Sequence, residues 1–271
     1  MSIRLSLRQA PDLRLDLRGL QPGLREVAAI ERLPLAQGRH FVALAEFFSV
    51  TAVDDGQDGL QLEGDLSRCD RLGWQMDGGR IQVEGAIGDY AGAGMRAGEL
   101  RVNGNAGLLA ACEMVGGRLE VQGNVGDLAA SGLPGSMDGM RGGNFIVRGN
   151  AGQRFGDRMR RGTALVFGDV GDFLASRMVA GSIAIGGQVG AHVGYGMRRG
   201  SLVFAGAVPA IAPTFVPAVA DALVFWQLLA RDLALHGGPF TPLPSRRIQR
   251  HLGDLAAGGK GELIIPLNTS S

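Results

Sequence analysis

The sequence is poor in the residues that would place it in several common protein classes. Its two cysteines, Cys69 and Cys112, lack the C-x-x-C spacing of zinc and iron–sulfur sites. Lys260 is its one lysine, so arginine supplies 26 of the 27 basic side chains. Acidic residues number 26 and the formal net charge is only +1, which argues against general nucleic-acid binding.

Long apolar runs are also missing. The N-terminus has no signal-peptide block, and no span of about 20 apolar residues is available for a membrane helix. Unpaired thiols suit a reducing compartment, so we expect a cytoplasmic protein. The missing apolar span and the small net charge lead us to expect no membrane partner and no nucleic-acid partner. The four histidines (His40, His192, His236, His251) are far apart in sequence and lack metal-binding spacing, and we predict no metal site.

Glycine, by contrast, is abundant, with 45 residues among 271, and it marks an internal repeat. A strand-like motif begins every 19 residues, at Gly79, Gly98 and Gly117. Gly143 follows after 26 residues, which indicates an insertion of 7 near residues 131–137, and the step then returns to 19. A second motif, G-x-x-G-x-x-x-G, comes next in each unit, with alanine in its last place in three units. Its glycines are Gly85, Gly88, Gly92, Gly104, Gly107, Gly123, Gly126, Gly149, Gly152, Gly156, Gly168, Gly171, Gly187, Gly190 and Gly194.

Each unit carries one short run in which apolar residues alternate with others. In the second unit, Leu100 and Val102 therefore point to the same side of a strand. A unit this short cannot bury its own apolar face, so neighbours must stack. No segment between the strands has helical periodicity, which excludes leucine-rich and helical repeats. The sequence predicts an all-β solenoid, a parallel β-helix of about seven coils.

The corners and the closing residue of each unit also have predicted roles. The glycines are expected to form the corners, and the methionine that closes each unit is interpreted as core packing rather than a cofactor site. The residue after the first motif glycine is polar in several units and is expected to stack into a ladder at one corner. These residues are Asn105, Asn124, Asn150, Asp169 and Gln188.

The flanking segments do not share the repeat. Residues 1–57 contain alternating runs and a short helical stretch at 24–32, which predicts a small α+β cap over the first coil. Residues 58–208 are predicted to form the β-helix. Residues 209–271 are predicted to be a C-terminal helix, over 217–236, and a tail that pack on the β-helix.

The outward position between the two inward columns changes character along the stack. It is polar in three units, at Gln82, Arg101 and Glu120, and apolar in the next four. An apolar stripe should not face water, so either the C-terminal helix covers it or it is a subunit interface. The apolar stripe comprises Ile146, Leu165, Ala184 and Val203. The helix face predicted to cover it comprises Val219, Ala220, Leu223, Trp226, Ala230 and Leu233.

A second stripe is basic, because arginines follow the closing methionine in several units. Val115 and Val179 interrupt this column. Stacked guanidinium groups suit carboxylates or phosphates, although a solvated edge with local ion pairs, for instance to Asp157, also explains them. The arginines are Arg96, Arg141, Arg160, Arg161, Arg198 and Arg199.

The sequence predicts no catalytic residue. Asp89, Asp127 and Asp172 recur at one place in their units, where hydrogen bonds to corner backbone explain them more simply than a cation site or an acid/base pair. His192 lies at a similar corner, and a structural role is favoured over contact with a ligand.

The G-x-x-G-x-x-x-G repeat resembles the C-terminal β-helix of glutamate synthase large chains and the C subunit of formylmethanofuran dehydrogenases. The flanking segments 33–38, 44–50 and 253–263 are similar to that C subunit. The resemblance implies a right-handed parallel β-helix within a multi-subunit complex of one-carbon metabolism. The arginine-rich composition favours the bacterial formyltransferase/hydrolase complex. The alternatives are the C subunit of a tungsten or molybdenum formylmethanofuran dehydrogenase and a glutamate-synthase-like β-helix domain.

In the bacterial complex, the resemblance implies transfer of a formyl group from formyl-tetrahydromethanopterin to a methanofuran-type carrier and its release as formate. The chemistry is then expected on an amidohydrolase-like hydrolase subunit and a formyltransferase subunit, which a B subunit accompanies. The C subunit is expected to be a scaffold without a cofactor of its own. Its arginine edge is expected to guide the acidic tail of the carrier or to dock an acidic subunit face. Stand-alone β-helix enzymes fit less well, since hexapeptide acyltransferases and sugar lyases have other signatures.

Overall fold

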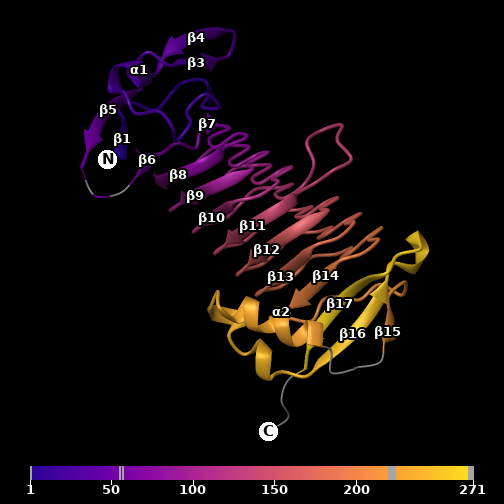
Figure 1. The fold of residues 1–271 in the computed structure, drawn as a ribbon. Coiled ribbons are helices and arrows are strands. Elements are labelled where there is room, and N and C mark those ends of the chain that lie inside the picture. The colour runs from indigo at the N-terminus through magenta and orange to yellow at the C-terminus, as the bar shows by residue number, and fades with distance from the viewer. Residues whose placement is uncertain (1, 55, 57, 219–223, 268–271) are drawn as a thin grey trace.

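The computed structural model describes residues 2–54, 56, 58–218 and 224–267. The regular secondary structure of these residues is mostly β (Figure 1). Eight strands follow one another in chain order through the middle of a 13-stranded sheet. They are β6 (Gly59–Glu63), β8 (Asp77–Glu84), β9 (Ala97–Val102), β10 (Arg118–Val121), β11 (Arg141–Val147), β12 (Arg161–Val166), β13 (Ser182–Ile185) and β14 (Ser201–Phe204). Each pairs in parallel with the next, so that Leu119 lies opposite Leu100 on one side and Phe145 on the other. The repeat read from the sequence is therefore the repeat of the sheet.

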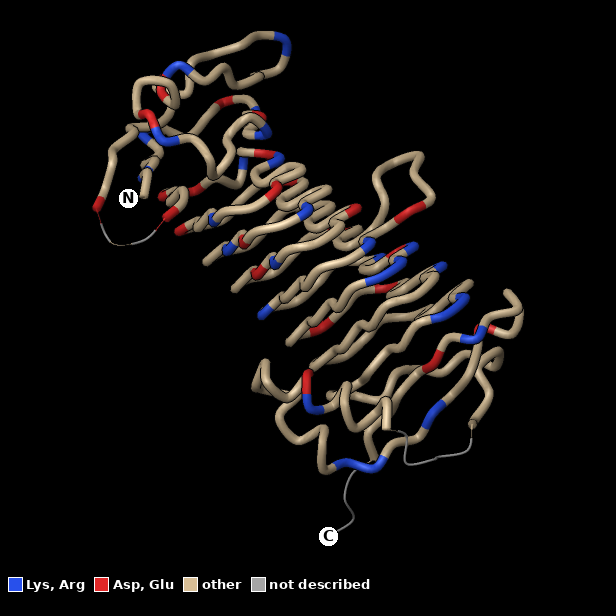
Figure 2. The backbone as a smooth tube through the Cα atoms, in the orientation of Figure 1, with Lys and Arg blue, Asp and Glu red and all other residues tan. Residues whose placement is uncertain are grey.

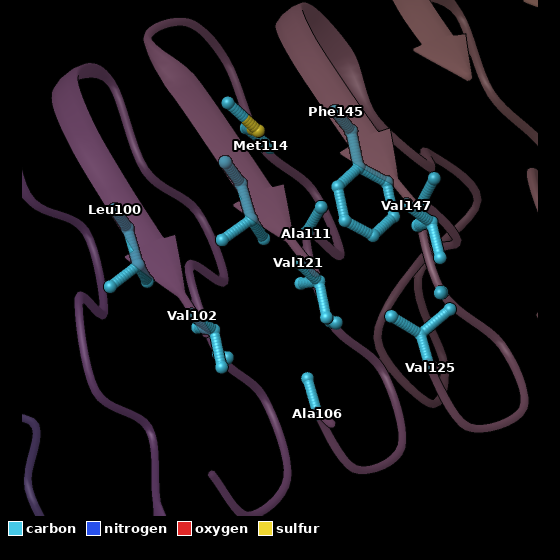
Figure 3. Close-up of a cluster of buried hydrophobic side chains, with 14 of the residues drawn as sticks. Leu100, Val102, Ala106, Ala111, Met114, Val121, Val125, Phe145 and Val147 are labelled. Carbon is cyan, nitrogen blue, oxygen red and sulfur yellow. The ribbon is translucent and has the colours of Figure 1, made fainter. Parts of the chain in front are cut away.

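A second line of parallel contacts accompanies these strands. It consists of one isolated bridge per step, as between Ala106 and Val125. Side chains of the strands and of the bridges belong to one buried cluster, in which Leu100 and Val102 are fully buried (Figure 3). The period-two alternation thus places both predicted inward columns in a common core.

The closing methionines lie in the same core, as predicted, and explain why glycine begins each unit. All seven are fully buried: Met76, Met95, Met114, Met140, Met159, Met178 and Met197. A Cβ built on Gly98 would lie 2.6 Å from Cε of Met76 and 2.5 Å from the carbonyl oxygen of Gly79. The φ of Gly98 is also +88°, a conformation that L-residues disfavour. Close stacking of backbone and methionine requires glycine there.

Side-chain oxygens hold successive units together at the glycine corners. Asn105 Oδ1 accepts a hydrogen bond from the backbone N–H of Asn124 at 2.8 Å, and Asn124 repeats this contact to Asn150. Asn150 and Asp169 continue the series toward Gln188. The predicted polar ladder is confirmed, and each rung satisfies a backbone donor of the next.

The N-terminal segment extends the same sheet instead of only covering its end. Strand β1 (Ser2–Leu7) pairs in parallel with β6 and antiparallel with β5 (Phe48–Val53). A second, four-stranded sheet contains β2 (Leu15–Asp16), β3 (Pro34–Gln37), β4 (His40–Ala43) and β7 (Cys69–Asp70). Helix α1 (Val27–Glu31) lies within the predicted helical stretch. Leu17 and Ile30 belong to the main core cluster, so the core continues into this segment.

The C-terminal segment contains strands that the sequence did not reveal. Helix α2 (Val224–Ala234) falls within the predicted helix, while Val219, Ala220 and Leu223 lie outside the described residues. Three further strands join the large sheet: β15 (Val216–Ala218), β16 (Ile248–Gly253) and β17 (Gly261–Pro266). Short 3₁₀ turns cover Leu44–Glu46, Gly238–Phe240, Leu243–Ser245 and Leu255–Ala257. The division at 57/58 and 208/209 stays a prediction, since one sheet includes strands from all three segments.

The apolar stripe is buried by this C-terminal segment. Ile146, Leu165, Ala184 and Val203 are between 0% and 1% exposed. They form one cluster with Trp226, Ala230 and Leu233 of α2 and with Ile264 of β17. These four side chains, put forward as a candidate interface, therefore present no surface to another subunit.

Candidate anion-binding groove

A groove lies along the edge of the stack where the chain enters β11, β12 and β14. Its volume is about 590 Å³. Its lining comprises Arg141, Arg160, Arg161, Val179, Ala180, Arg198 and Arg199. The structure thus brings together five of the six arginines predicted from sequence. Figure 2 shows basic positions gathered along this edge.

The backbone fixes the position of these arginines. The N–H of Arg160 donates to the carbonyl of Met140, and the N–H of Arg198 to that of Met178, each at 2.8 Å. The buried methionine therefore anchors the residue one unit further along, and the arginine side chain is left exposed. Successive strands lie about 4.8 Å apart, so the Arg160–Arg161 pair and the Arg198–Arg199 pair, two steps apart, are separated by about 10 Å. The smaller Val179 and Ala180 lie between them.

Acidic partners are distributed unevenly along the groove. Arg160 forms an ion pair with Asp138, which directly follows the insertion near residues 131–137, and Arg141 lies 3.9 Å from Glu113. For Arg161, Arg198 and Arg199, the described part of the chain provides no ion pair and no side-chain hydrogen bond. One half of the groove is therefore partly neutralised and the other keeps its positive charge.

Asp157 does not neutralise this edge, contrary to the local ion pairing considered from the sequence. Its side chain is buried and accepts hydrogen bonds from Arg177 at 2.8 and 2.9 Å. Arg158 lies beside it, with a 3.8 Å contact. Both partners, Arg158 and Arg177, take left-handed backbone conformations, and neither lines the groove.

Lys260 extends the basic column by one more step, which the sequence did not predict. Strand β17 pairs with β14 so that Glu262 lies opposite Ser201. In the same register the backbone N–H of Lys260 donates to the carbonyl of Arg198 at 2.7 Å. A strand from the C-terminal segment is needed to bring this residue here, so no spacing in the repeat signals it.

Arg96 does not line the groove; it lies in a smaller neighbouring pocket of about 250 Å³, whose lining it shares with Arg141. Leu133 of the inserted loop also lines this pocket, and its N–H donates to Glu113 Oε1 at 3.2 Å.

Cys112, which forms a small cluster with Leu109, is fully buried. Burial raises the pKa of Cys112 to about 12, and that of Cys69 to about 12, so both thiols stay protonated and unreactive near neutral pH.

The recurring aspartates act on the backbone. Oδ1 of Asp89 accepts from the N–H of Leu108 at 2.9 Å, and Asp127 and Asp172 make the same contact in their own units at 2.8 and 2.7 Å. The structural interpretation is confirmed. Within the described ranges, no group of three or more His, Cys, Asp or Glu residues is arranged to hold a metal ion. His192 stacks on Phe173, with ring centroids 4.6 Å apart.

The chain is similar to known proteins both in sequence and in fold. No family model matches the chain. A segment of 56 residues is 45% identical to the C subunit of the formyltransferase/hydrolase complex Fhc from Methylorubrum extorquens, and spans 21% of either protein. The whole fold is similar to a chain in the crystal structure of the formyltransferase/hydrolase complex FhcABCD from the same organism, in complex with methylofuran. The TM-score is 0.89 and the identity 39%, over 98% of this chain and 100% of that one. The chain belongs to the Fhc C-subunit family.

Membership of the Fhc C-subunit family confirms the resemblance carried by the glycine repeat and its two flanks. The chain spans the full length of the subunit it resembles in that complex. Among its described residues, this Fhc C-type chain has no helix that is long and apolar enough to cross a membrane. The groove described above is thus a feature of a chain whose relative belongs to a complex with other subunits.

Proposed function

We propose that the chain is the non-catalytic scaffold subunit of a formyltransferase/hydrolase complex of one-carbon metabolism. The similarity over the full length of a chain in such a complex carries this proposal. In it, the repeat is a right-handed parallel β-helix that presents fixed outer edges to an amidohydrolase-like subunit, a formyltransferase subunit and the B subunit. The complex moves formyl from formyl-tetrahydromethanopterin to a methanofuran-type carrier and releases formate, in the cytoplasm.

The packing of the chain supports a scaffold role. One buried cluster runs from Ile3 in β1 to Ile265 in β17, so the interior is filled by side chains along the whole stack. Interiors packed in this way transmit force and deform little. The recurring polar side chains at the corners accept hydrogen bonds from backbone N–H groups of the next unit, and these contacts hold successive units together.

Purification of the tagged chain from its native source tests this proposal. We expect the other subunits to accompany it, with formyl transfer and hydrolysis in the complex and none in the chain alone. Metal analysis of the same sample separates this complex from a tungsten or molybdenum dehydrogenase. Turnover by the pure chain, or its isolation without partners under gentle conditions, would contradict the proposal.

A further inference from the structure

We propose that the open edge of strand β5 binds an extended strand of another subunit, and that basic residues flank this added strand at both ends. Strand β5 is the last strand of the large sheet at its N-terminal end, and among the described residues it pairs with β1 only (Figure 1). An added strand continues such a sheet through main-chain hydrogen bonds. That the strand belongs to a subunit of the complex rests on the proposed scaffold role, whereas binding by the edge does not.

The register of β5 on β1 determines which backbone groups face the open edge. The N–H of Arg8 donates to the carbonyl of Phe47 at 2.8 Å, so these opposite residues form a hydrogen-bonded pair. Hydrogen-bonded pairs alternate along antiparallel strands, so every second residue of β5 turns its N–H and C=O away from β1. These residues are Phe48, Val50 and Ala52. Within the described ranges no backbone group pairs with this side of the strand.

Helix α1 packs on the inner face of β5 and not on its edge. The helix contacts the strand, and Ile30 belongs to the same buried cluster as Phe48 and Val50. On the opposite face Thr51 is exposed. The contact between helix and strand is therefore made by side chains, and the backbone groups along the edge stay unpaired by described residues.

The two ends of the large sheet differ in how they are protected against pairing. Natural edge strands are very short or carry proline or lysine, because a free edge pairs readily with other chains. Strand β15, at the other end, has three residues with Pro217 in the middle, which has no N–H to donate. Strand β5 has six residues and contains neither proline nor a charged residue. Its unprotected edge is expected of a strand that pairs in an assembly.

Carboxylates at the two ends of β5 decide which strand fits. Glu46 and Asp54 are exposed, and neither forms an ion pair with a described residue. If a second copy paired with this edge in the register that forms most hydrogen bonds, with Val50 opposite Val50, Glu46 would lie opposite Asp54 at each end. Like charges directly opposite one another destabilise a strand pair. Lysine or arginine at the ends of the added strand pairs with both carboxylates instead, so the edge favours a strand with basic ends over a second copy.

Fluorescence anisotropy of a labelled peptide titrated with the full chain at low salt tests the proposal. The probe is an amidated peptide, Lys-Val-Thr-Val-Thr-Val-Lys, whose central residues favour an extended strand. The counterpart has the same centre and glutamate at both ends. The lysine peptide should bind about tenfold more tightly, because two exposed ion pairs are replaced by like charges in the counterpart. Equal binding of the two peptides, or binding of neither, would overturn the proposal.

Ala52→Pro tests the main-chain contact. It removes an N–H from the open edge, where proline is tolerated, and leaves the hydrogen-bonded pairs with β1 in place. Binding of the lysine peptide should weaken about tenfold, the equivalent of one main-chain hydrogen bond. Thr51→Ala, at the neighbouring exposed position whose N–H faces β1, is the matched control and should stay within about twofold. Thermal unfolding verifies that both variants are folded, and equal loss in both would contradict pairing at the edge.

Glu46→Gln/Asp54→Asn tests the flanking charges without altering the backbone. It should weaken the lysine peptide about threefold to tenfold and bring the two peptides closer in affinity. Asp77→Asn/Asp232→Asn removes the same charge from exposed carboxylates on β8 and α2, and should change binding less than twofold, since distant charges are screened. Equal effects of the two double variants would show that the ends of β5 do not select the strand.

The purified complex identifies the occupant. It should bind the lysine peptide at least tenfold more weakly than the free chain, because a strand of another subunit already fills the edge. Equal binding by the complex and the free chain would overturn the proposal. So would a dimer of the free chain that Ala52→Pro converts to a monomer, since the occupant would then be a second copy. The peptide titrations use the free chain, so they fail or succeed separately from the purification that tests the scaffold role.

Discussion

The first and second halves of the strand stack share one interior and differ on their outer face. In β8, β9 and β10 the outward residues are Gln82, Arg101 and Glu120, whereas in β11 to β14 they are apolar. The C-terminal segment packs over the apolar half at the end of the stack farther from the N-terminus (Figure 1). Whether the outward residues are polar or apolar thus depends on whether the C-terminal segment covers them, whereas the inward residues are apolar in both halves.

Glu120 marks the boundary between the two halves. It is only 6% exposed and accepts hydrogen bonds from Arg118 and Arg148. Arg148 also donates to the backbone carbonyl of His236, just after α2, and lies over the ring of Phe167. A buried carboxylate is therefore tolerated at the edge of the cover because two guanidinium groups match its charge.

The largest effect is expected where a polar group replaces the apolar stripe. Leu165→Asn should destabilise the chain by about 5 kcal/mol, because it loses core packing and buries an amide without partners. The equivalent change in the open half, Arg101→Asn, should cost less than about 0.5 kcal/mol. Urea unfolding followed by circular dichroism measures both. Similar costs for the two variants would show that the halves do not differ in cover.

Weakening the cover itself should have a smaller effect. Trp226→Ala, which removes the largest buried side chain of α2, should destabilise by about 3 kcal/mol. Leu228→Ala on the exposed side of the same helix should be nearly neutral. Amide exchange would then show faster opening of α2 than of β9 in the Trp226 variant. Uniformly faster exchange would argue that the cover and the stack unfold as one unit.

The corner ladder runs through both halves and should respond equally in each. Asn150→Ala removes the acceptor for the N–H of Asp169 and should cost about 1 kcal/mol. Asn144→Ala, whose exposed side chain makes no hydrogen bond with the described residues, is the matched control. A negligible cost for Asn150→Ala, by thermal unfolding, would mean that water replaces the lost acceptor.

The smallest effect concerns the boundary carboxylate. Burial raises the pKa of Glu120, but hydrogen bonds from Arg118 and Arg148 outweigh it, and the net pKa is lowered from its ordinary value. Its ionised form therefore stabilises the fold above the unfolded-state pKa of about 4.3, and this contribution is lost as the pH falls through the lower folded value. Because the Arg118 and Arg148 side chains are themselves 39% and 29% exposed, Glu120→Gln should cost under about 1 kcal/mol at pH 7, and nothing once the carboxylate is protonated. A difference that persists in acid, relative to exposed Asp12→Asn, would contradict this account.

Much of this architecture could be predicted from local pattern. The alternation of Leu100 and Val102 predicted the inward columns, and the methionine after each corner predicted the core filler. In one unit Ala111 stands where the last motif glycine stands in others, and its backbone takes the same left-handed conformation as that glycine. Ala111 takes φ +56°, like Gly92 at φ +64°, so this corner accepts a Cβ. The arginine column followed from the same repeat.

Other parts depended on residues far apart in the chain. Strands β16 and β17 were not predicted, because the tail has no repeat that would signal them. Strand β17 pairs with β14, although most of the C-terminal segment lies between the two strands in sequence. The pairing of Asp138 with Arg160 arises from an insertion, whose direction no spacing reveals. Lys260 joined the basic edge only through the register of β17.

The sequence by itself determined the repeat, its inward columns and its glycine corners, because period-two alternation and a 19-residue step act on neighbouring units. Only the tertiary structure decided which arginines have no acidic partner among the described residues and which segment covers the apolar stripe. Those outcomes depend on contacts between distant segments, and whether a charge is paired or an apolar face is covered is settled by the side chains that the completed fold places beside it.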